Sequence, residues 1–273
     1  MKKKDNKTQM AKELGVSRGM LYYTHKRDVS DEVIKKLILD VLDKHKAYGH
    51  KRIAPELGLN KKRILRVMKK FGIKPIRRRK MPVKPEDQNK QPVVFQNLIK
   101  TFCPIQPNVV WVGDFTYLNF QSKFYYLSTA MDLFTREIIG WSFSNTHNTK
   151  LVIEAFDEAR NKTNKLPMYF HSDQGSEYDS HEHLTLVQNL GVLISMSKKS
   201  SPWENGFQES FYSNFKLELG DPDRFNSLGE LIEAISIQFH YYNNDRIHTK
   251  LKTSPTKFRL QRTREYVFKE MGT

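Results

Sequence analysis

The sequence predicts a full-sized mixed α/β domain preceded by a small, basic, all-α domain. The chain has 273 residues, enough for one large and one small domain. Its excess positive charge lies in the first 80 residues, which hold 25 Lys and Arg against 8 Asp and Glu, whereas the remaining residues hold 21 against 22. Strand-like and helix-like segments alternate beyond residue 108, while residues before 75 show helical periodicity.

The composition excludes several classes of protein. A hydrophobic fraction of 38% and an aromatic fraction of 12% are sufficient for a packed core. No apolar run approaches the roughly 20 residues of a spanning helix, and the start lacks the apolar stretch of a signal peptide, so we expect a cytoplasmic protein without membrane contact. The single cysteine, Cys103, excludes an intrachain disulfide and a zinc site of paired cysteines, and we interpret it as an inert thiol.

Residues 1–75 are predicted to form a basic helical DNA-binding region. Residues 7–27 place apolar side chains at helical spacing on either side of Gly15, which indicates a helix-turn-helix or an ordinary helical hairpin. Ser30 is expected to open a second helix and Asn60 to cap a third. That third helix combines an apolar stripe with basic side chains suited to a DNA groove, so the predicted contacts are Lys61, Lys62, Arg63, Arg66, Lys69 and Lys70.

Residues 76–107 are predicted to be a proline-rich basic linker. Six prolines lie between Lys74 and Pro107, and regular apolar repeats are few. An extended basic segment can follow a phosphate backbone. The linker residues expected to contact DNA are Arg77, Arg78, Arg79 and Lys80.

Residues 108–262 are predicted to form the catalytic core, followed by a tail at 263–273. Three aromatic-rich and β-branched segments are expected to form consecutive strands, followed by helix, strand, helix, strand and helix. This order is that of a ribonuclease-H-like fold with a mixed five-stranded sheet and flanking helices. A fold of this kind suits metal chemistry.

Three carboxylates are candidates for the catalytic and metal-binding residues. Asp114 lies within the first expected strand among apolar neighbours, where a carboxylate is costly unless it is paired or bound to a cation. Asp173 ends the fourth strand beside Gly175, and ligands of α/β sheets gather at strand ends. Taken singly, each Asp is more often a turn former or a cap. Glu209 lies on the helix that follows, and Glu204 is a weaker alternative for the third ligand.

Lys216 follows Glu209 by seven residues, close to two helical turns, so both are expected on one helix face about 10 Å apart. We therefore add Lys216 to the catalytic and DNA-binding candidates, against the alternative of a solvated surface lysine. The other predicted DNA contacts of the core are Lys198, Lys199 and Asn205. His171, Trp203 and Tyr212 are weaker candidates for metal orientation or base stacking, and the pair His181 and His183 lacks further zinc ligands.

The motifs WxxDxTY at 111–117 and HSDxGxxY at 171–178, and the 35 residues between Asp173 and Glu209, resemble the DDE signature of the retroviral-integrase superfamily. The chain is most similar to second-frame transposases of the insertion-sequence-three family, and the YGHKRI block at 48–53 and the tail YNNDRIHTKLKTSP at 242–255 extend the likeness. Glu204-Asn205 departs from the family's common Asp-Asn, which puts that loop's DNA contact in doubt.

The resemblance implies Mg²⁺-dependent DNA cleavage followed by transfer of a 3′-OH strand during transposition of a bacterial insertion sequence. Two Mg²⁺ ions are expected, with Mn²⁺ able to substitute; Asp114 would bridge them, and Asp173 and Glu209 would each anchor one. The implied partners are double-stranded DNA of the element ends and target, further copies of the chain, and an upstream-frame protein joined by fusion or interaction. A nucleoid-associated location and weak specific binding by the isolated chain follow from the same resemblance.

Two other functions remain open from the sequence. A nuclease or junction resolvase on the same fold would keep the three carboxylates but would not join DNA. A regulator derived from a transposase would bind DNA with a silent core, although the presence of Asp114, Asp173 and Glu209 weakens that reading.

Overall fold

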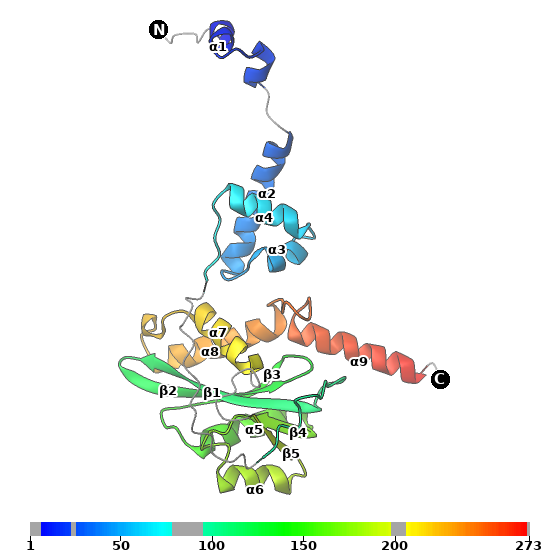
Figure 1. Ribbon diagram of the computed structural model, residues 1–273. Helices are drawn as coiled ribbons and strands as arrows, with labels where there is room; N and C mark the ends of the chain where they lie inside the picture. Colours follow the sequence, from blue (N-terminus) through cyan, green and yellow to red (C-terminus); the bar gives the residue numbers. More distant parts are fainter. Residues whose placement is uncertain (1–6, 23–25, 78–94, 198–205, 272–273) are drawn as a thin grey trace. The chain divides into compact units, whose positions relative to one another are not determined.

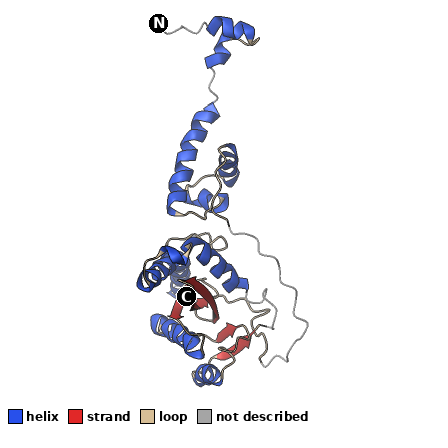
Figure 2. Ribbon diagram, turned by 90° about the vertical axis from the view of Figure 1, so that its left-hand side faces the viewer, coloured by secondary structure: helices blue, strands red, loops and turns tan. Residues whose placement is uncertain are grey.

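The computed structural model describes residues 7–22, 26–77, 95–197 and 206–271. The chain divides into two compact units, residues 1–75 and 76–273. The described part of the first unit is helical, and the second contains one sheet with helices on both of its faces (Figure 1, Figure 2).

The first unit is built around three packed helices. Its elements are α1 (Lys7–Glu13), the 3₁₀ helix η1 (Arg18–Tyr22), α2 (Lys26–Lys44), α3 (His50–Glu56) and α4 (Lys61–Lys70). Asn60 caps α4 as predicted, since its side chain accepts a hydrogen bond from the Lys62 amide at 2.8 Å. Apolar side chains at helical spacing fill the space between α2, α3 and α4; those buried include Ile34, Ile38, Ile53, Ile64 and Val67.

The start of α2 differs from the prediction. The helix begins at Lys26, four residues before Ser30, so Ser30 is not its cap. Ser30 accepts a hydrogen bond from Arg63, and the buried Asp31 carboxylate accepts hydrogen bonds from Arg66 and Lys70. The polar pair Ser30-Asp31 therefore ties α2 to α4, a contact that a local capping pattern cannot reveal.

The helix-turn-helix also lies elsewhere than expected. Residues 7–22 form α1 and a short 3₁₀ helix rather than two α-helices, because Gly19 disfavours helix in a segment too short to offset it. A helix-turn-helix arrangement is instead formed by α3 and α4, which are joined by residues 57–60. Gly58 has φ +63 in this turn, a conformation that glycine adopts without a steric penalty.

The second unit contains the predicted five-stranded mixed sheet. Its strands are β1 (Val110–Phe120), β2 (Lys123–Asp132), β3 (Ile138–Ser144), β4 (Tyr169–Ser172) and β5 (Leu193–Met196), in the order β3-β2-β1-β4-β5. The first three strands form an antiparallel meander, and β4 and β5 run parallel to β1. This arrangement confirms the predicted ribonuclease-H-like fold.

Helices cover the two faces of the sheet and create two cores. In Figure 1, α5 (Thr149–Thr163) and α6 (His181–Asn189) lie below the sheet, and α7 (Gly206–Leu219) and α8 (Leu228–Asn244) lie above it. The short 3₁₀ helix η3 (Pro222–Arg224) connects α7 to α8. Gly140 allows α5 to approach β3 closely, since a Cβ there would lie 2.2 Å from the Ala155 carbonyl oxygen. Strand β1, which carries Asp114, has one core on each of its faces.

Two segments of the second unit extend the expected domain. Residues 95–99 lie beside the edge strand β5, where the Leu98 amide donates to Ser195 Oγ at 2.9 Å, and Ile99 is buried against β1. Helix α9 (Pro255–Met271) crosses the expected boundary between core and tail at residue 262. None of the helices in the described parts of the chain is long and apolar enough to span a membrane.

Candidate active site

The register of the sheet brings Asp114 and Asp173 together. Val112 of β1 pairs in parallel with His171 of β4, so Asp114 and Asp173, each two residues further along, lie at the same level. The two-residue period of a strand also points Asp114 toward the same side of the sheet as Val112. Two carboxylates separated by 58 residues of sequence therefore meet where β4 ends and β1 continues.

The turn after β4 is shaped around the Asp173 carboxylate. Its Oδ1 accepts a hydrogen bond from the Gly175 amide at 3.0 Å. A Cβ at Gly175 would lie 3.1 Å from that same oxygen, so the absence of a side chain leaves room for the carboxylate. This geometry explains the choice of glycine in the HSDxGxxY motif.

Glu209 lies in the first turn of α7, as predicted. Phe211, Phe215 and Leu219 of this helix are buried in the core above the sheet, which leaves Glu209 on the exposed side. The helix begins at Gly206, directly after residues 198–205, which lie outside the described part of the chain. Packing of the aromatic stripe thus sets which side chains of α7 face β1.

Two buried polar side chains fix α7 against β1 at Val112 and at Asp114. Gln208 Nε2 donates to the Val112 carbonyl oxygen at 2.6 Å, and the Tyr212 hydroxyl donates to the Asp114 carbonyl oxygen at 2.8 Å. Tyr212 and Thr129, the β2 partner of Asp114, also share a hydrogen bond of 2.9 Å between their hydroxyls. Gln208 and Tyr212 flank Glu209 on the helix, so they set its position relative to Asp114.

Both other acids affect the pKa of Asp114. Burial and then the charges of Asp173 and Glu209 raise the pKa of Asp114 well above its usual range, although the Phe115 amide partly offsets this. Burial also raises the pKa of Asp173, with a further contribution from the carboxylate of Glu177. A cation at this point would relieve the repulsion that the protein itself leaves in place.

Lys216 and Glu209 line one pocket, as their two-turn spacing requires. The pocket is open to solvent and has a volume of about 910 Å³. Burial lowers the pKa of Lys216, whose Nζ lies 4.6 Å from the centre of the Tyr117 ring. The core residues that line the pocket include Asp114, Thr116, Glu209, Ser210, Tyr212, Ser213 and Lys216.

The three carboxylates have the ligand chemistry of a site for a hard divalent cation, but their positions meet only part of its geometry. Three carboxylates supply the oxygen ligands that Mg²⁺ and Mn²⁺ prefer. Among the described residues, however, no three His, Cys, Asp or Glu side chains are close enough together to hold a metal ion. Asp114 and Asp173 are adjacent across the sheet, whereas Glu209 is exposed, so a site with all three ligands requires Glu209 to move inward.

A fourth acid, Glu177, lies near the site and was not predicted from the sequence. Its side chain is buried, and its Oε1 lies 3.1 Å from His147 Nε2. His147 comes from the segment between β3 and α5, and its ring contacts Phe115, the neighbour of Asp114, at 4.6 Å between centroids. The second acid in HSDQGSEY was the available signal for Glu177, but nothing in the sequence pairs it with His147.

Other predicted residues have structural roles. His171 is fully buried and its Nδ1 lies 2.9 Å from Ser195 Oγ, and His183 Nδ1 lies 3.0 Å from the Tyr178 carbonyl oxygen. Burial lowers the pKa of His183 to about 4, so this ring is neutral at pH 7. Tyr212 is buried rather than available for base stacking. Several predicted residues lie outside the described part: Arg78, Arg79, Lys80, Lys198, Lys199, Trp203, Glu204 and Asn205.

The basic side chains of α4 are exposed, and some of them also hold the helical unit together. Arg66 and Lys70 bind the Asp31 carboxylate at 2.5 and 3.1 Å. Lys61, Lys62 and Lys69 are exposed on the same helix, and Arg77 is exposed beyond it. Part of the charge predicted to contact DNA is therefore already engaged with an acid of the protein.

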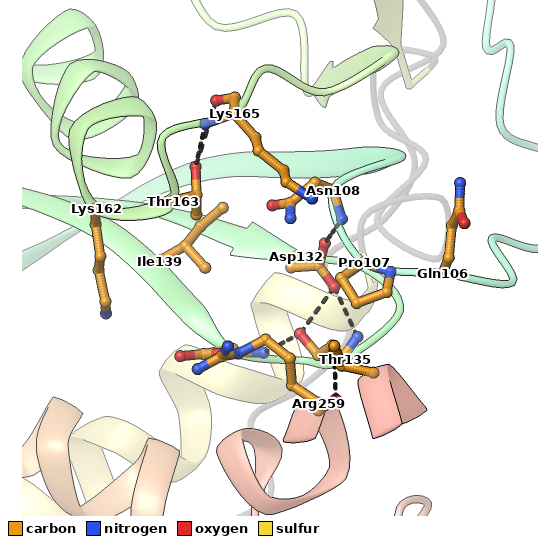
Figure 3. A pocket seen from close by; sticks show the side chains of 12 residues that line it. Gln106, Pro107, Asn108, Asp132, Thr135, Ile139, Lys162, Thr163, Lys165 and Arg259 are labelled. Carbon is orange, nitrogen blue, oxygen red and sulfur yellow. Dashed lines mark hydrogen bonds and ion pairs between the residues drawn. The ribbon is translucent and has the colours of Figure 1, made fainter. Parts of the chain in front are cut away.

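A second pocket, of about 470 Å³, lies beside the start of β1, where Asn108, Asp132 and Thr135 line it (Figure 3). Asp132 accepts hydrogen bonds there from the amides of Asn108 and Thr135, at 2.6 and 2.7 Å. Arg259 binds Glu137 at 2.7 Å. Both acids are therefore bound by groups of the protein: Glu137 ties the sheet to α9, and Asp132 holds the segments on either side of it.

Comparison with known proteins agrees with this architecture. Two family profiles, both described as Integrase core domain, match residues 104–202 and 190–255. The solved integrase assembly of simian T-cell lymphotropic virus shares the fold, with a TM-score of 0.52 and 16% identity over 80% of this chain and 73% of that one. The fold and the integrase core define a polynucleotidyl transferase, a metal-dependent class of enzyme.

Curated relatives narrow the class to a family. The transposase for insertion sequence element IS904 of Lactococcus lactis is 33% identical over 85% of this chain and 96% of its own length. The transposase for insertion sequence IS3A of Escherichia coli is 29% identical over 74% of this chain and 73% of its own. The chain belongs to the insertion-sequence-three family of DDE transposases.

Proposed function

We propose that the chain cleaves DNA at the ends of its insertion sequence and transfers the resulting 3′-OH ends to a new phosphodiester, using Mg²⁺ held by Asp114, Asp173 and Glu209. The single observation that carries this proposal is the convergence of charge at Asp114. Its side chain is half-buried, and both other acids raise its pKa. Asp114 and Glu209 line the open pocket and Asp173 is adjacent to Asp114 across the sheet, an arrangement suited to binding divalent cations against a phosphate.

The bound ions would supply an activated oxygen nucleophile and would stabilise the charge on the phosphate and the leaving oxygen. The chain's own residues do the positioning. The sheet fixes Asp114 and Asp173. Gln208 and Tyr212 hold α7 against β1, and α7 carries Glu209. Lys216 lies in the same pocket, where its ammonium group is suited to binding a phosphate beside the cleaved bond.

DNA contacts outside the pocket would come from the basic helical unit and the linker. The exposed side chains of Lys61, Lys62 and Lys69 on α4 form part of this proposed surface. Arg77, which lines the candidate pocket itself, is a further proposed contact. The remaining proposed contacts rest on the sequence and lie outside the described residues: Arg78, Arg79, Lys80, Lys198, Lys199 and Asn205. Because two element ends must be joined, we propose that the protein acts as a multimer on DNA.

The test is an assay of the full chain with end-labelled DNA of the element terminus, in Mg²⁺ and in Mn²⁺, scored for both nicked and joined products. A second substrate carries a pre-cleaved 3′-OH end, since a nuclease without joining activity would leave it unchanged. We expect nicking and joining by the wild type and neither by Asp114→Asn or Asp173→Asn. Equal products from wild type and variants would overturn the proposal, and nicking without joining would reduce it to a nuclease.

A further inference from the structure

Two large aromatic side chains stand exposed together on the β1–β2 hairpin. Tyr117 is 57% exposed and Phe124 is 54% exposed, and their rings meet edge to face at 5.5 Å between centroids. Tyr117 is also the last residue of the WxxDxTY motif, and metal binding by the acids does not explain a Tyr at this position. Exposed apolar groups gathered at one place mark a binding site more often than scattered single residues do.

The pair belongs to a continuous aromatic strip on one face of the sheet. Tyr117 is paired across the strands with Tyr126, and Phe115 lies two residues nearer to Asp114 on the same side of β1. The ring of His147 contacts both Phe115 and Tyr126, at 4.6 and 4.9 Å between centroids. The opposite face of the hairpin is covered by α7 and α8, which bury Leu118 and Phe120.

Phe115 and Tyr117 point to the opposite face of β1 from Asp114 and Thr116, and Tyr117 links the strip to the candidate active-site pocket through Lys216. Lys216 lines that pocket together with Asp114, and its Nζ lies 4.6 Å from the centre of the Tyr117 ring. Thr116, which precedes Tyr117, lines the pocket as well. The exposed Lys123 precedes Phe124 on β2. A cation for a phosphate and a ring for a base are thus placed within the span of about one nucleotide.

We propose that Tyr117 and Phe124 form a stacking platform for unpaired bases of the DNA strand whose backbone enters the candidate active site. The inference rests on the proposed function, because it takes DNA as the substrate. Rings accept any base through its π face, so the platform would bind without regard to sequence. Lys216, which lines the pocket and lies beside Tyr117, favours a nucleic-acid strand over a protein segment as the occupant.

An exposed aromatic pair also stabilises a hairpin, so the test must separate stacking from folding. The full chain is therefore titrated, in EDTA and at fixed salt, with one duplex that ends in three unpaired nucleotides and with the same duplex made blunt. A 2-aminopurine base in the unpaired end reports stacking through loss of its fluorescence. EDTA removes catalysis, so binding is measured whether or not the protein cleaves DNA.

Three variants are compared with the wild type. The double variant Tyr117→Leu with Phe124→Leu removes both rings, and Tyr117→Phe keeps the ring at 117. Phe102→Leu is the matched control, since Phe102 is 39% exposed and packs on Tyr169 of β4, away from the pocket. Thermal unfolding of each variant checks that the fold is intact.

We expect the double variant to bind the duplex with the unpaired end about 5- to 150-fold more weakly for each base that stacks, and to lose the fluorescence change. Tyr117→Phe and Phe102→Leu should bind like the wild type, and all four proteins should bind the blunt duplex within twofold of one another. Unchanged affinity for the unpaired end, or an equal loss on both duplexes, overturns the platform. Loss of self-association with unchanged binding of the unpaired end also overturns it, in favour of a second copy.

The two proposals fail separately. A wild-type protein that prefers the unpaired end through these rings but makes no product in Mg²⁺ supports the platform and refutes the strand-transfer function. A protein that cleaves and joins DNA while the double variant retains its binding refutes the platform alone.

Discussion

Replacing Tyr212 by Phe removes one oxygen atom from the interface that positions Glu209. The hydroxyl lies 2.8 Å from the Asp114 carbonyl oxygen, 3.2 Å from the Leu127 carbonyl oxygen and 2.9 Å from Thr129 Oγ1. The residue is 6% exposed, so water cannot readily replace the lost contacts. The ring remains, and its packing against the core of α7 and α8 is unchanged.

The expected cost follows from the partners left behind. The two carbonyl oxygens belong to paired strands, so the loss falls mainly on Thr129, whose remaining contact to Gln208 Oε1 is long at 3.4 Å. A buried hydrogen bond removed in this way costs about 1–2 kcal/mol. For a unit of this size that corresponds to a fall in Tm of about 2–8 °C.

The effect on catalysis should exceed the effect on stability. Since the hydroxyl joins α7 to the backbone of Asp114, its loss lets Glu209 shift relative to that carboxyl. We expect about 10- to 100-fold slower nicking and a higher Mg²⁺ concentration for half-maximal rate. Tyr117→Phe is the control, because it removes the same atom from an exposed Tyr of β1. If Tyr212→Phe matches Tyr117→Phe in Tm, rate and Mg²⁺ dependence, the positioning role is refuted.

Three further predictions concern charged side chains. Asp114→Asn should raise the Tm of the metal-free protein at pH 7.5. Because the folded pKa of Asp114 lies above the unfolded one, this gain in Tm should shrink as the pH falls toward 4. A lower Tm of the variant at pH 7.5 would contradict the prediction. Lys216→Gln should weaken DNA binding and reduce the slope of log affinity against log salt by about one, whereas Lys216→Arg should keep the slope. If Lys216→Gln leaves both the affinity and the slope unchanged, Lys216 is not part of the DNA interface. Asp31→Asn should lower the Tm of the helical unit at pH 7, measured by circular dichroism. Hydrogen bonds from Arg66 and Lys70 hold the pKa of Asp31 below its usual range, so the difference in Tm should be present above about pH 4 and disappear as the pH falls through the folded pKa. An equal difference in Tm at all pH values would count against the ion pair.

The strands and their sequence along the chain were predictable because their signals are local. Aromatic and β-branched runs divided by turns identify β1, β2 and β3, and the parallel register of β4 then places Asp173 beside Asp114. The spacing of Glu209 and Lys216 needs only helix geometry to put both at one pocket. These predictions depend on periodicities that tertiary contacts do not alter.

The residues that hold the site together were not predictable, because their partners are distant in sequence. Gln208 binds Val112 and Tyr212 binds Asp114, across 96 and 98 residues. One signal was present: Gln208 is a polar residue on the buried stripe of α7, where an apolar residue is expected. The pair Ser30-Asp31 resembles a helix cap for the same reason: its partners on α4, which show its real role, lie more than 30 residues away.

The central claim, that Asp114, Asp173 and Glu209 together hold divalent cations, is tested most directly by crystals of the full chain bound to element-end DNA and soaked in Mn²⁺. Anomalous diffraction locates the ions without reference to activity. The account predicts peaks within about 2.0–2.3 Å of oxygens of all three carboxylates, with Glu209 turned inward from its exposed position. Peaks bound by other residues, or no peak between Asp114 and Asp173, would contradict it.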